Sequence, residues 1–267
     1  MTPFIPRLLA LACVLFLFMP AALAKNRNTG FLDRIVTVDG TTYKYQVFVP
    51  ASWDKHKKAP VLLFLHGAGE RGDDGVLQTD IGIGHAIREH AAQFEMIVVM
   101  PQCRKEHVWT ETAMQAQALG ALEQSMKEFN GDRSRVYLSG ISMGGYGTWD
   151  IAAHYPGKFA AVVPVCGGIR GLEHYPQIGV SLAKDPKISD PYAETAKRIG
   201  TTPLWVFHGG ADDTVPVEGS RQMVEALRKA GGNVKYTEYP GVGHNSWDKA
   251  YAEPDFVPWL LSQSLHH

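Results

Sequence analysis

The amino-acid sequence predicts an α/β fold, with a mostly parallel, eight-stranded sheet flanked by helices. Strand-like apolar runs alternate with helix-like amphipathic segments along the chain, which is typical of a parallel sheet covered by helices. Six of these runs are almost continuously apolar, as buried parallel strands are. With 267 residues, 45% hydrophobic and 20% charged, the chain can build one large core, and no internal repeat or linker divides it.

The first two strand-like runs, FLDRIVTV and YKYQVFVP, alternate apolar and polar residues and lie close together in the chain. We expect them to form an antiparallel pair at the start of the sheet. The six apolar runs that follow should form the parallel part of the sheet, and they comprise residues 61–66, 96–101, 135–141, 159–165, 203–209 and 234–240.

The segments between the strands have helical patterns, and residues 167–189 are an exception. That stretch is punctuated by glycine and proline, so we expect a long loop over the sheet that is too short to form a large lid. In an open parallel sheet, ligands bind beyond the carboxyl ends of the strands. The predicted helices comprise residues 80–92, 112–129, 143–154, 191–199, 217–229 and 247–262.

The N-terminus has the composition of a secretory signal peptide. Arg7 precedes an apolar run, and the ALA sequence at residues 22–24 supplies small residues for cleavage. We therefore predict a signal peptide over residues 1–24 and one domain over residues 25–267, exported to the periplasm or out of the cell. A retained anchor, or lipid attachment at Cys13, is the alternative.

The charge balance and the cysteine and histidine patterns exclude several classes of partner. A formal net charge of -1 leaves no electrostatic footprint for nucleic acid or an anionic membrane, and we expect no stable membrane insertion after signal cleavage. There is no CxxC or HExxH motif and the eleven histidines are scattered, so we expect no metal site. The serine mechanism predicted below needs no cofactor. Cys103 and Cys166 remain in the exported chain, where they could form a disulfide or stay as two buried thiols.

The sequence SGISMGGYG places Ser142 in a G-x-S-x-G motif. The motif follows a predicted strand and precedes a predicted helix, which is the context in which such a serine acts as a nucleophile. Gly140 and Gly144 suit a turn where backbone and helix approach too closely for a Cβ. The alternative is a serine that only caps the turn.

A serine nucleophile needs a base and an acid that orients the base, and both follow later strands. HGGADDTVP carries Asp212 and Asp213, and YPGVGHNSW carries His244. We predict Asp212 as the acid because it lies nearer the end of its strand, and His244 as the base. Two other histidines, His66 and His208, should hold loops by hydrogen bonds.

An oxyanion hole requires two backbone N–H groups. One should come from Met143, at the positive end of the helix that follows the serine. The other should come from the glycine-rich loop HGAGERGDDG, where Ala68 is the candidate. In the same loop, Glu70 and Arg71 could touch a polar leaving group, but we expect them to pair with each other or with neighbours on the surface.

Two tryptophans are candidates for substrate contacts. Trp109 and Trp247 lie on predicted loops at the edge of the sheet where the catalytic residues are expected. They could offer an aromatic wall to a sugar or phenolic ester, and packing in the core is the alternative.

Several ordered motifs together resemble the alpha/beta-hydrolase superfamily: HGAGERG, PQC followed by Trp109, GISMGGYGTW, HGGADDTVP and GVGHNSWDKAY. The chain is most similar to exported members of the dienelactone hydrolase and phospholipase/carboxylesterase branch, some of which are labelled predicted peptidases. The resemblance implies the alpha/beta-hydrolase fold, with a triad at Ser142, Asp212 and His244 and an oxyanion donor at Ala68. Dienelactone hydrolases proper use cysteine where this chain has serine.

These observations predict an exported serine carboxylic ester hydrolase that works through an acyl-enzyme. The substrate should be a small-molecule or carbohydrate-linked ester with a short acyl or phenolic group, because no large lid is expected. Alternatives are a serine peptidase of the same fold, or a binding protein on this scaffold without catalysis.

Overall fold

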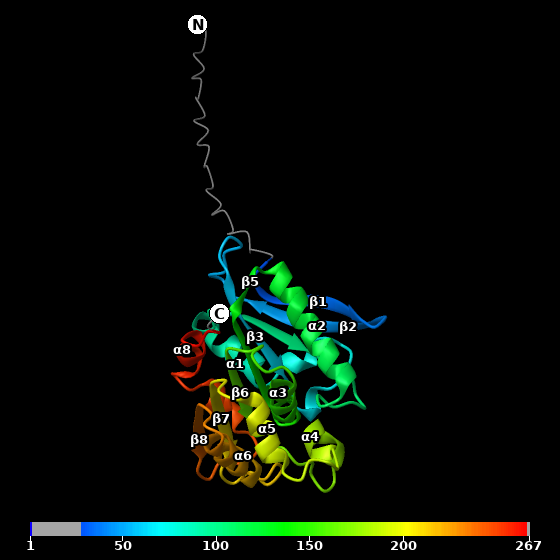
Figure 1. Ribbon diagram of the computed structural model, residues 1–267. Coiled ribbons are helices and arrows are strands. Elements are labelled where there is room, and N and C mark those ends of the chain that lie inside the picture. The colour runs from blue at the N-terminus through cyan, green and yellow to red at the C-terminus, as the bar shows by residue number, and fades with distance from the viewer. Residues whose placement is uncertain (2–27, 266–267) are drawn as a thin grey trace.

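The computed structural model describes Met1 and residues 28–265, which form one eight-stranded sheet with helices on both faces (Figure 1). The strand order is β1-β2-β4-β3-β5-β6-β7-β8. The predicted α/β class with a mostly parallel sheet is therefore confirmed. The predicted signal peptide, including Cys13, lies outside the described residues apart from Met1.

The sheet begins with an antiparallel hairpin of β1 (Gly30–Val38) and β2 (Thr41–Val49), as predicted. The connecting residues Asp39 and Gly40 have φ angles of 48° and 77°. Positive φ at both positions is what a two-residue turn between twisted strands requires, and an Asp-Gly pair tolerates it. β2 pairs antiparallel with β4, which joins the hairpin to the parallel part of the sheet.

The six remaining strands pair with one another in parallel and correspond to the six apolar runs. Each apolar run therefore forms the expected strand, and the bounds of the strands differ from the predicted bounds by only a few residues. The strands are β3 (Ala59–Leu65), β4 (Ile97–Pro101), β5 (Gly131–Ile141), β6 (Ala161–Val165), β7 (Leu204–Gly209) and β8 (Val234–Tyr239).

Two hydrophobic clusters fill the space between the sheet and its helices. Along β3, Leu63 and Leu65 contribute to one cluster, whereas Leu62 and Phe64 contribute to the other, because successive strand side chains point to opposite faces. The first cluster packs under α2 (Thr112–Glu128), α3 (Met143–His154), α5 (Pro191–Ile199) and α6 (Glu218–Lys229), and the second under α1 (Ile83–His90), α7 (Trp247–Tyr251) and α8 (Phe256–Leu261).

The structure corrects two predicted elements. The single helix expected over residues 247–262 is divided into α7 and α8. Pro254 lies between them, and proline disfavours helical backbone at the residue before it. The expected loop at 167–189 contains a short helix, α4 (Ser181–Lys184), but no large lid.

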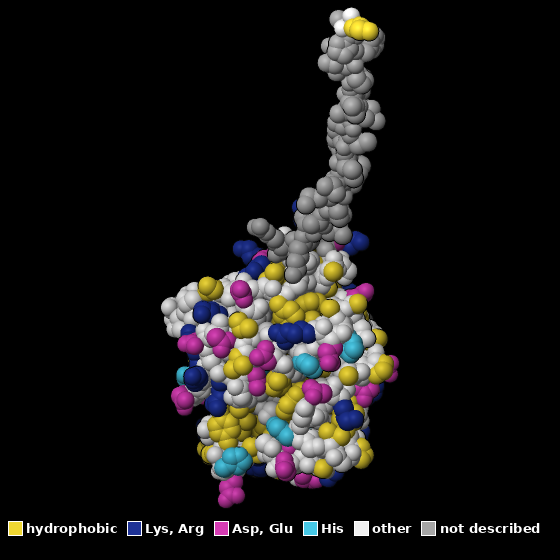
Figure 2. Space-filling model, turned by 180° about the vertical axis from the view of Figure 1, so that it is seen from behind, with side chains coloured by type: hydrophobic (Ala, Val, Ile, Leu, Met, Phe, Trp, Pro, Cys, Tyr) yellow, Lys and Arg dark blue, Asp and Glu magenta, His cyan; other side chains and the backbone are white. Residues whose placement is uncertain are grey.

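On the face shown in Figure 2, acidic and basic side chains are interspersed, and neither kind forms a large patch. This distribution agrees with the formal net charge of -1. Among the described residues, no helix is both long and apolar enough to span a membrane.

The packing of α3 against the sheet should make Gly144 indispensable. In Gly144→Ala, the new Cβ would lie 2.0 Å from the backbone oxygen of Leu65 and 2.7 Å from that of His66. We expect the free energy of unfolding to fall by at least ~2 kcal/mol, since neither backbone group can move freely. Gly219→Ala in α6 is the control, because the nearest atom would be 3.7 Å away. Urea unfolding followed by tryptophan fluorescence would refute this explanation if both variants were equally stable.

Candidate functional site

Ser142 lies in the turn between β5 and α3 and has an unusual backbone conformation. Its φ of 51° and ψ of -118° place it outside the helix that starts at Met143. A positive φ costs energy in a residue other than glycine, and such strain is common at functional sites. The conformation is held by hydrogen bonds from the N–H of Ser142 to the oxygen of Val165 (3.0 Å) and from the N–H of Tyr146 to the oxygen of Ser142 (3.1 Å). The serine side chain is thereby presented at the carboxyl end of the sheet.

The structure brings Ser142, His244 and Asp212 together from loops that follow β5, β8 and β7. Nε2 of His244 lies 2.9 Å from Oγ of Ser142, and Nδ1 of His244 lies 2.8 Å from Oδ2 of Asp212. The side chain of His244 is 20% exposed, whereas that of Asp212 is fully covered. The histidine can therefore reach both the serine and the solvent while the carboxylate is shielded.

Asp212 is held in its ionised form by the groups around it. Burial alone would raise the pKa of this carboxyl, but hydrogen bonds from His208, His244 and the N–H of Val215 outweigh it, so the pKa lies well below its usual range. Oδ1 accepts the N–H groups of Thr214 (2.9 Å) and Val215 (2.8 Å). A carboxylate fixed in this way can orient the imidazole and balance its positive charge.

Asp213, the neighbouring acid, lies apart from this arrangement. Its side chain is exposed and accepts a hydrogen bond of 3.3 Å from the hydroxyl of Thr214. The structure therefore directs Asp212, and not Asp213, toward His244.

His208 and His66 are both buried and hold loops, as expected. His208 contacts the hydroxyl of Ser220 (2.7 Å) and the oxygen of Val215 (2.9 Å). Its Nε2 also lies 3.2 Å from Oδ2 of Asp212, a contact that the sequence did not reveal. Burial lowers the pKa of His66 to about 4, so this ring is neutral near pH 7.

The glycine-rich loop after β3 lies against the turn that contains Ser142. A Cβ placed on Gly67 would be 3.8 Å from Cβ of Ser142. Ala68 begins the 3-10 helix η1 (Ala68–Glu70) and Met143 begins α3. The first N–H groups of a helix have no partner within the helix, so both residues have the donor that the oxyanion prediction requires.

Side chains beneath this loop fix its backbone. Nδ1 of His66 contacts the oxygen of Gly67 (2.6 Å), and Nε2 accepts the N–H of Cys103 (2.9 Å). Nε2 of Gln102 donates to the oxygen of Glu70 (3.1 Å). This contact of Gln102 is not evident from the sequence, since nothing in a lone glutamine signals it.

The two tryptophans differ in position. Trp109 is fully buried, packs against His66 and donates its indole N–H to the backbone oxygen of that residue at 3.0 Å. Its predicted contact with substrate is therefore wrong, because the ring packs in the core. Trp247 is partly exposed at the start of α7, and its ring stands edge to face with His244 at 5.4 Å. A substrate contact at Trp247 stays a prediction.

Glu70 and Arg71 do not pair with each other. Arg71 extends across the surface to Tyr175, to whose hydroxyl it donates at 2.9 Å, and its Nε donates to the oxygen of Ala68. Oε2 of Glu70 is buried and has no hydrogen-bond partner among the described residues. Arg71 therefore pairs with a surface neighbour, Tyr175, as expected, whereas Oε2 of Glu70 does not pair with a neighbour.

Cys103 and Cys166 are both buried and are not joined to each other. Cys166 adjoins the candidate site: its Sγ and one ligand atom each of Asp212 and His244 all lie within 4.8 Å of one another. Such a trio could hold a metal ion, which the sequence did not suggest. Asp212 and His244 already use these atoms in their hydrogen bonds, however, and burial raises the pKa of the Cys166 thiol.

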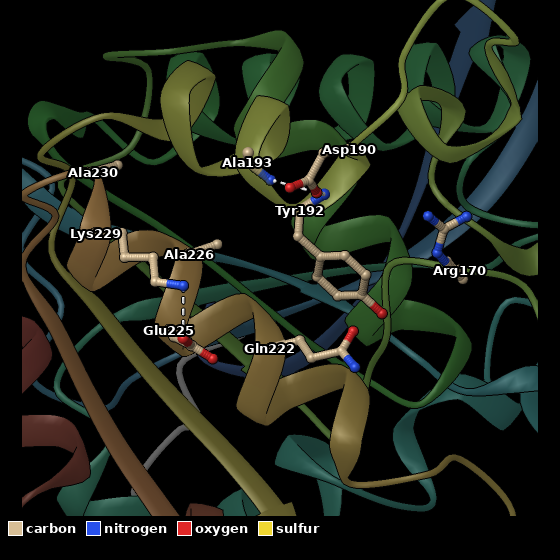
Figure 3. Close-up of a pocket in the computed structure, with 9 residues that line it drawn as sticks. All are labelled: Arg170, Asp190, Tyr192, Ala193, Gln222, Glu225, Ala226, Lys229 and Ala230. Atoms are coloured by element: carbon tan, nitrogen blue, oxygen red, sulfur yellow. Dashed lines mark hydrogen bonds and ion pairs between the residues drawn. The ribbon is translucent and has the colours of Figure 1, made fainter.

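A separate hollow of about 530 Å³ lies between α5 and α6 (Figure 3). The ring of Tyr192 reaches into it beside Gln222, and Arg170 stands on its far side. None of the predicted site residues lines this hollow. It is therefore distinct from the space around Ser142.

Comparison with known proteins gives a family match and a similar solved structure. The model of the prolyl oligopeptidase family matches residues 109–261. A thermostable esterase of known crystal structure is 32% identical to this chain. The superposition covers 88% of this chain and 63% of the esterase chain, with a TM-score of 0.70.

Curated relatives match over only part of their length. An uncharacterized secreted protein of Arthroderma benhamiae is 29% identical over 223 residues, which is 76% of this chain and 23% of that protein. Acyl-protein thioesterase 1 of Neurospora crassa is 30% identical over 133 residues, 49% of this chain and 46% of that one. The chain thus spans less than half the length of these relatives.

The family match extends over more than half of the chain and includes all three residues that meet at the candidate site. This chain belongs to the prolyl oligopeptidase family of the alpha/beta-hydrolase superfamily.

Proposed function

We propose that the protein is a serine carboxylic ester hydrolase in which Ser142, His244 and Asp212 form the catalytic triad. The continuous hydrogen-bond chain from Oγ of Ser142 through His244 to Asp212 carries this proposal. The crystal structure of a thermostable esterase, at 32% identity, supports the same class of reaction.

In the proposed reaction, Oγ of Ser142 attacks the ester carbonyl while Nε2 of His244 takes its proton. The N–H groups of Met143 and Ala68 bind the oxyanion that forms. As the tetrahedral intermediate collapses, His244 protonates the leaving alcohol and an acyl-serine remains. Water then attacks that acyl group with His244 as base, which releases the acid and restores the serine. Asp212 stays ionised throughout and stabilises the imidazolium.

We infer that the substrates are short-acyl, phenolic or carbohydrate-linked esters. Partly exposed Trp247 beside His244 supports an aromatic surface next to the reacting bond. A secreted relative in Arthroderma benhamiae supports export. Peptide hydrolysis is the second candidate, because the matching family is named for oligopeptidases.

Hydrolysis of p-nitrophenyl esters graded from acetyl to palmitoyl tests the reaction class. We expect the initial rate of the chain from Lys25 onward to fall with acyl length and to drop by about 10⁶-fold in Ser142→Ala, which lacks the nucleophile. Equal rates for wild type and Ser142→Ala would rule out the serine mechanism. Cleavage of a peptide anilide faster than of the acetyl ester would favour the peptidase.

The two adjacent acids provide a matched pair of variants. Asp212→Asn should lower kcat/KM by about 10⁴-fold, because the imidazole loses the carboxylate that orients and stabilises it. Asp213→Asn should leave kcat/KM nearly unchanged, since Asp213 contacts only Thr214. Both constants can be measured on p-nitrophenyl acetate, and equal losses would contradict the assignment of the acid.

Asp212 should also link stability to pH. Because its pKa is lowered in the folded chain, its contribution to stability is present above the ordinary carboxyl pKa of ~3.9 and is lost as the pH falls below it. We therefore expect the difference in unfolding free energy between wild type and Asp212→Asn to shrink from about pH 6 to about pH 3. A difference that stays constant over this range in urea unfolding would argue against an ionised Asp212.

A further inference from the structure

The carboxyl group of Glu70 lies against Gly67, and Gly67 adjoins the proposed nucleophile, Ser142. A Cβ built on Gly67 would be 3.0 Å from Oε2 of Glu70, 3.8 Å from Cβ of Ser142 and 3.9 Å from Cγ1 of Ile141. These side chains therefore border one small space next to the serine. The loop that contains Glu70 also supplies Ala68, the proposed oxyanion donor.

One oxygen of this carboxyl lacks a partner. Oε2 is buried and has no hydrogen bond from any residue that the structure describes, and the adjacent Arg71 directs its guanidinium to Ala68 and Tyr175 instead. Burial raises the pKa of Glu70, contacts with the backbone of Glu70 and Gly67 offset part of this effect, and the negative charge of Asp80 raises it further. A buried polar oxygen without a partner costs free energy, so its retention calls for a reason.

The proposed reaction makes this arrangement more costly. An oxyanion develops beside Ser142, and a carboxylate close by repels it. A hydrogen-bond donor on the substrate would relieve both problems, because it would pair with Oε2 and its positively polarised hydrogen would offset part of the repulsion by the carboxylate. An apolar ester would leave both problems in place.

Building on the proposed function, we propose that Glu70 is a specificity-determining residue that accepts a hydrogen bond from a hydroxyl or ammonium group carried by the substrate near the scissile ester. The natural substrates are then esters of hydroxylated or amino-bearing compounds. Simple alkyl and aryl esters are turned over without this contact.

Matched esters of nearly equal size test this assignment. On the acyl side, ethyl 2-methylpropanoate, ethyl lactate and ethyl alaninate carry a methyl, a hydroxyl and an ammonium group at the same position. On the alcohol side, propyl acetate and 2-hydroxyethyl acetate differ by a methyl and a hydroxyl. Each kcat/KM is measured by pH-stat near neutral pH and divided by the hydroxide-catalysed rate of that ester, which removes differences in intrinsic reactivity.

For the wild type, we expect at least one donor-bearing ester to exceed its apolar partner by about tenfold or more after normalisation. Glu70→Gln keeps the size of the side chain but removes its charge. It should lower kcat/KM for the preferred ester about tenfold while leaving that of the apolar ester unchanged or higher. A merely structural role would lower both. Glu225→Gln, an exposed glutamate that pairs with Lys229 on α6, is the control and should change neither.

Two results would overturn the assignment: no preference in the wild type on either the acyl or the alcohol side, or a preference that Glu70→Gln retains at undiminished strength. The first needs no variant, so it does not depend on how well Glu70→Gln folds. The pair that shows the preference distinguishes a hydroxyl from an ammonium group. If no ester in the set is hydrolysed in a Ser142-dependent way, the proposed function fails. Equal normalised rates in a Ser142-dependent reaction would reject only the role of Glu70.

Discussion

The backbone of α3 packs so closely on the carboxyl ends of β3 and β6 that side chains are excluded from the contact. A Cβ on Gly144 would lie 2.0 Å from the oxygen of Leu65, and one on Gly145 would lie 2.7 Å from the oxygen of Val165. The first turn of α3 lies at this contact, directly after Ser142 with its φ of 51°. The other groups of the candidate site are arranged around that turn, so its geometry sets the distances at which they meet the serine.

Asp212 connects the remaining parts of the site. Its carboxylate contacts His244 and His208 and accepts two backbone N–H groups from its own loop. His208 in turn contacts Ser220, whose hydroxyl donates to the oxygen of Gly167 after β6. The loops after β6, β7 and β8 are thereby connected through hydrogen bonds to the buried carboxylate of Asp212. Such a network holds the imidazole in one orientation because every group in it has a partner.

Glu70 and Arg71 show how two adjacent charged residues can serve different purposes. Arg71 stabilises the loop by contacts with Ala68 and Tyr175, and so joins η1 to the segment after β6. Glu70 turns inward instead, and its Oε2 has no hydrogen-bond partner within residues 28–265. In a site where most buried polar groups are paired, an unpaired one near the proposed nucleophile is explained by the hydrogen-bond donor that we propose the substrate brings.

The sequence by itself determined the fold class, the strands, most helix positions and the three residues that meet at the candidate site. It could do so because continuous apolar runs, glycines around Ser142 and polar residues directly after strands are local signals with a fixed structural meaning. Only the tertiary structure decided which way side chains face. It placed Trp109 in the core, linked His208 to Asp212, separated Glu70 from Arg71 and set Cys166 beside the site. These contacts join residues distant in sequence, and their orientation depends on how the loops pack, which no local pattern encodes.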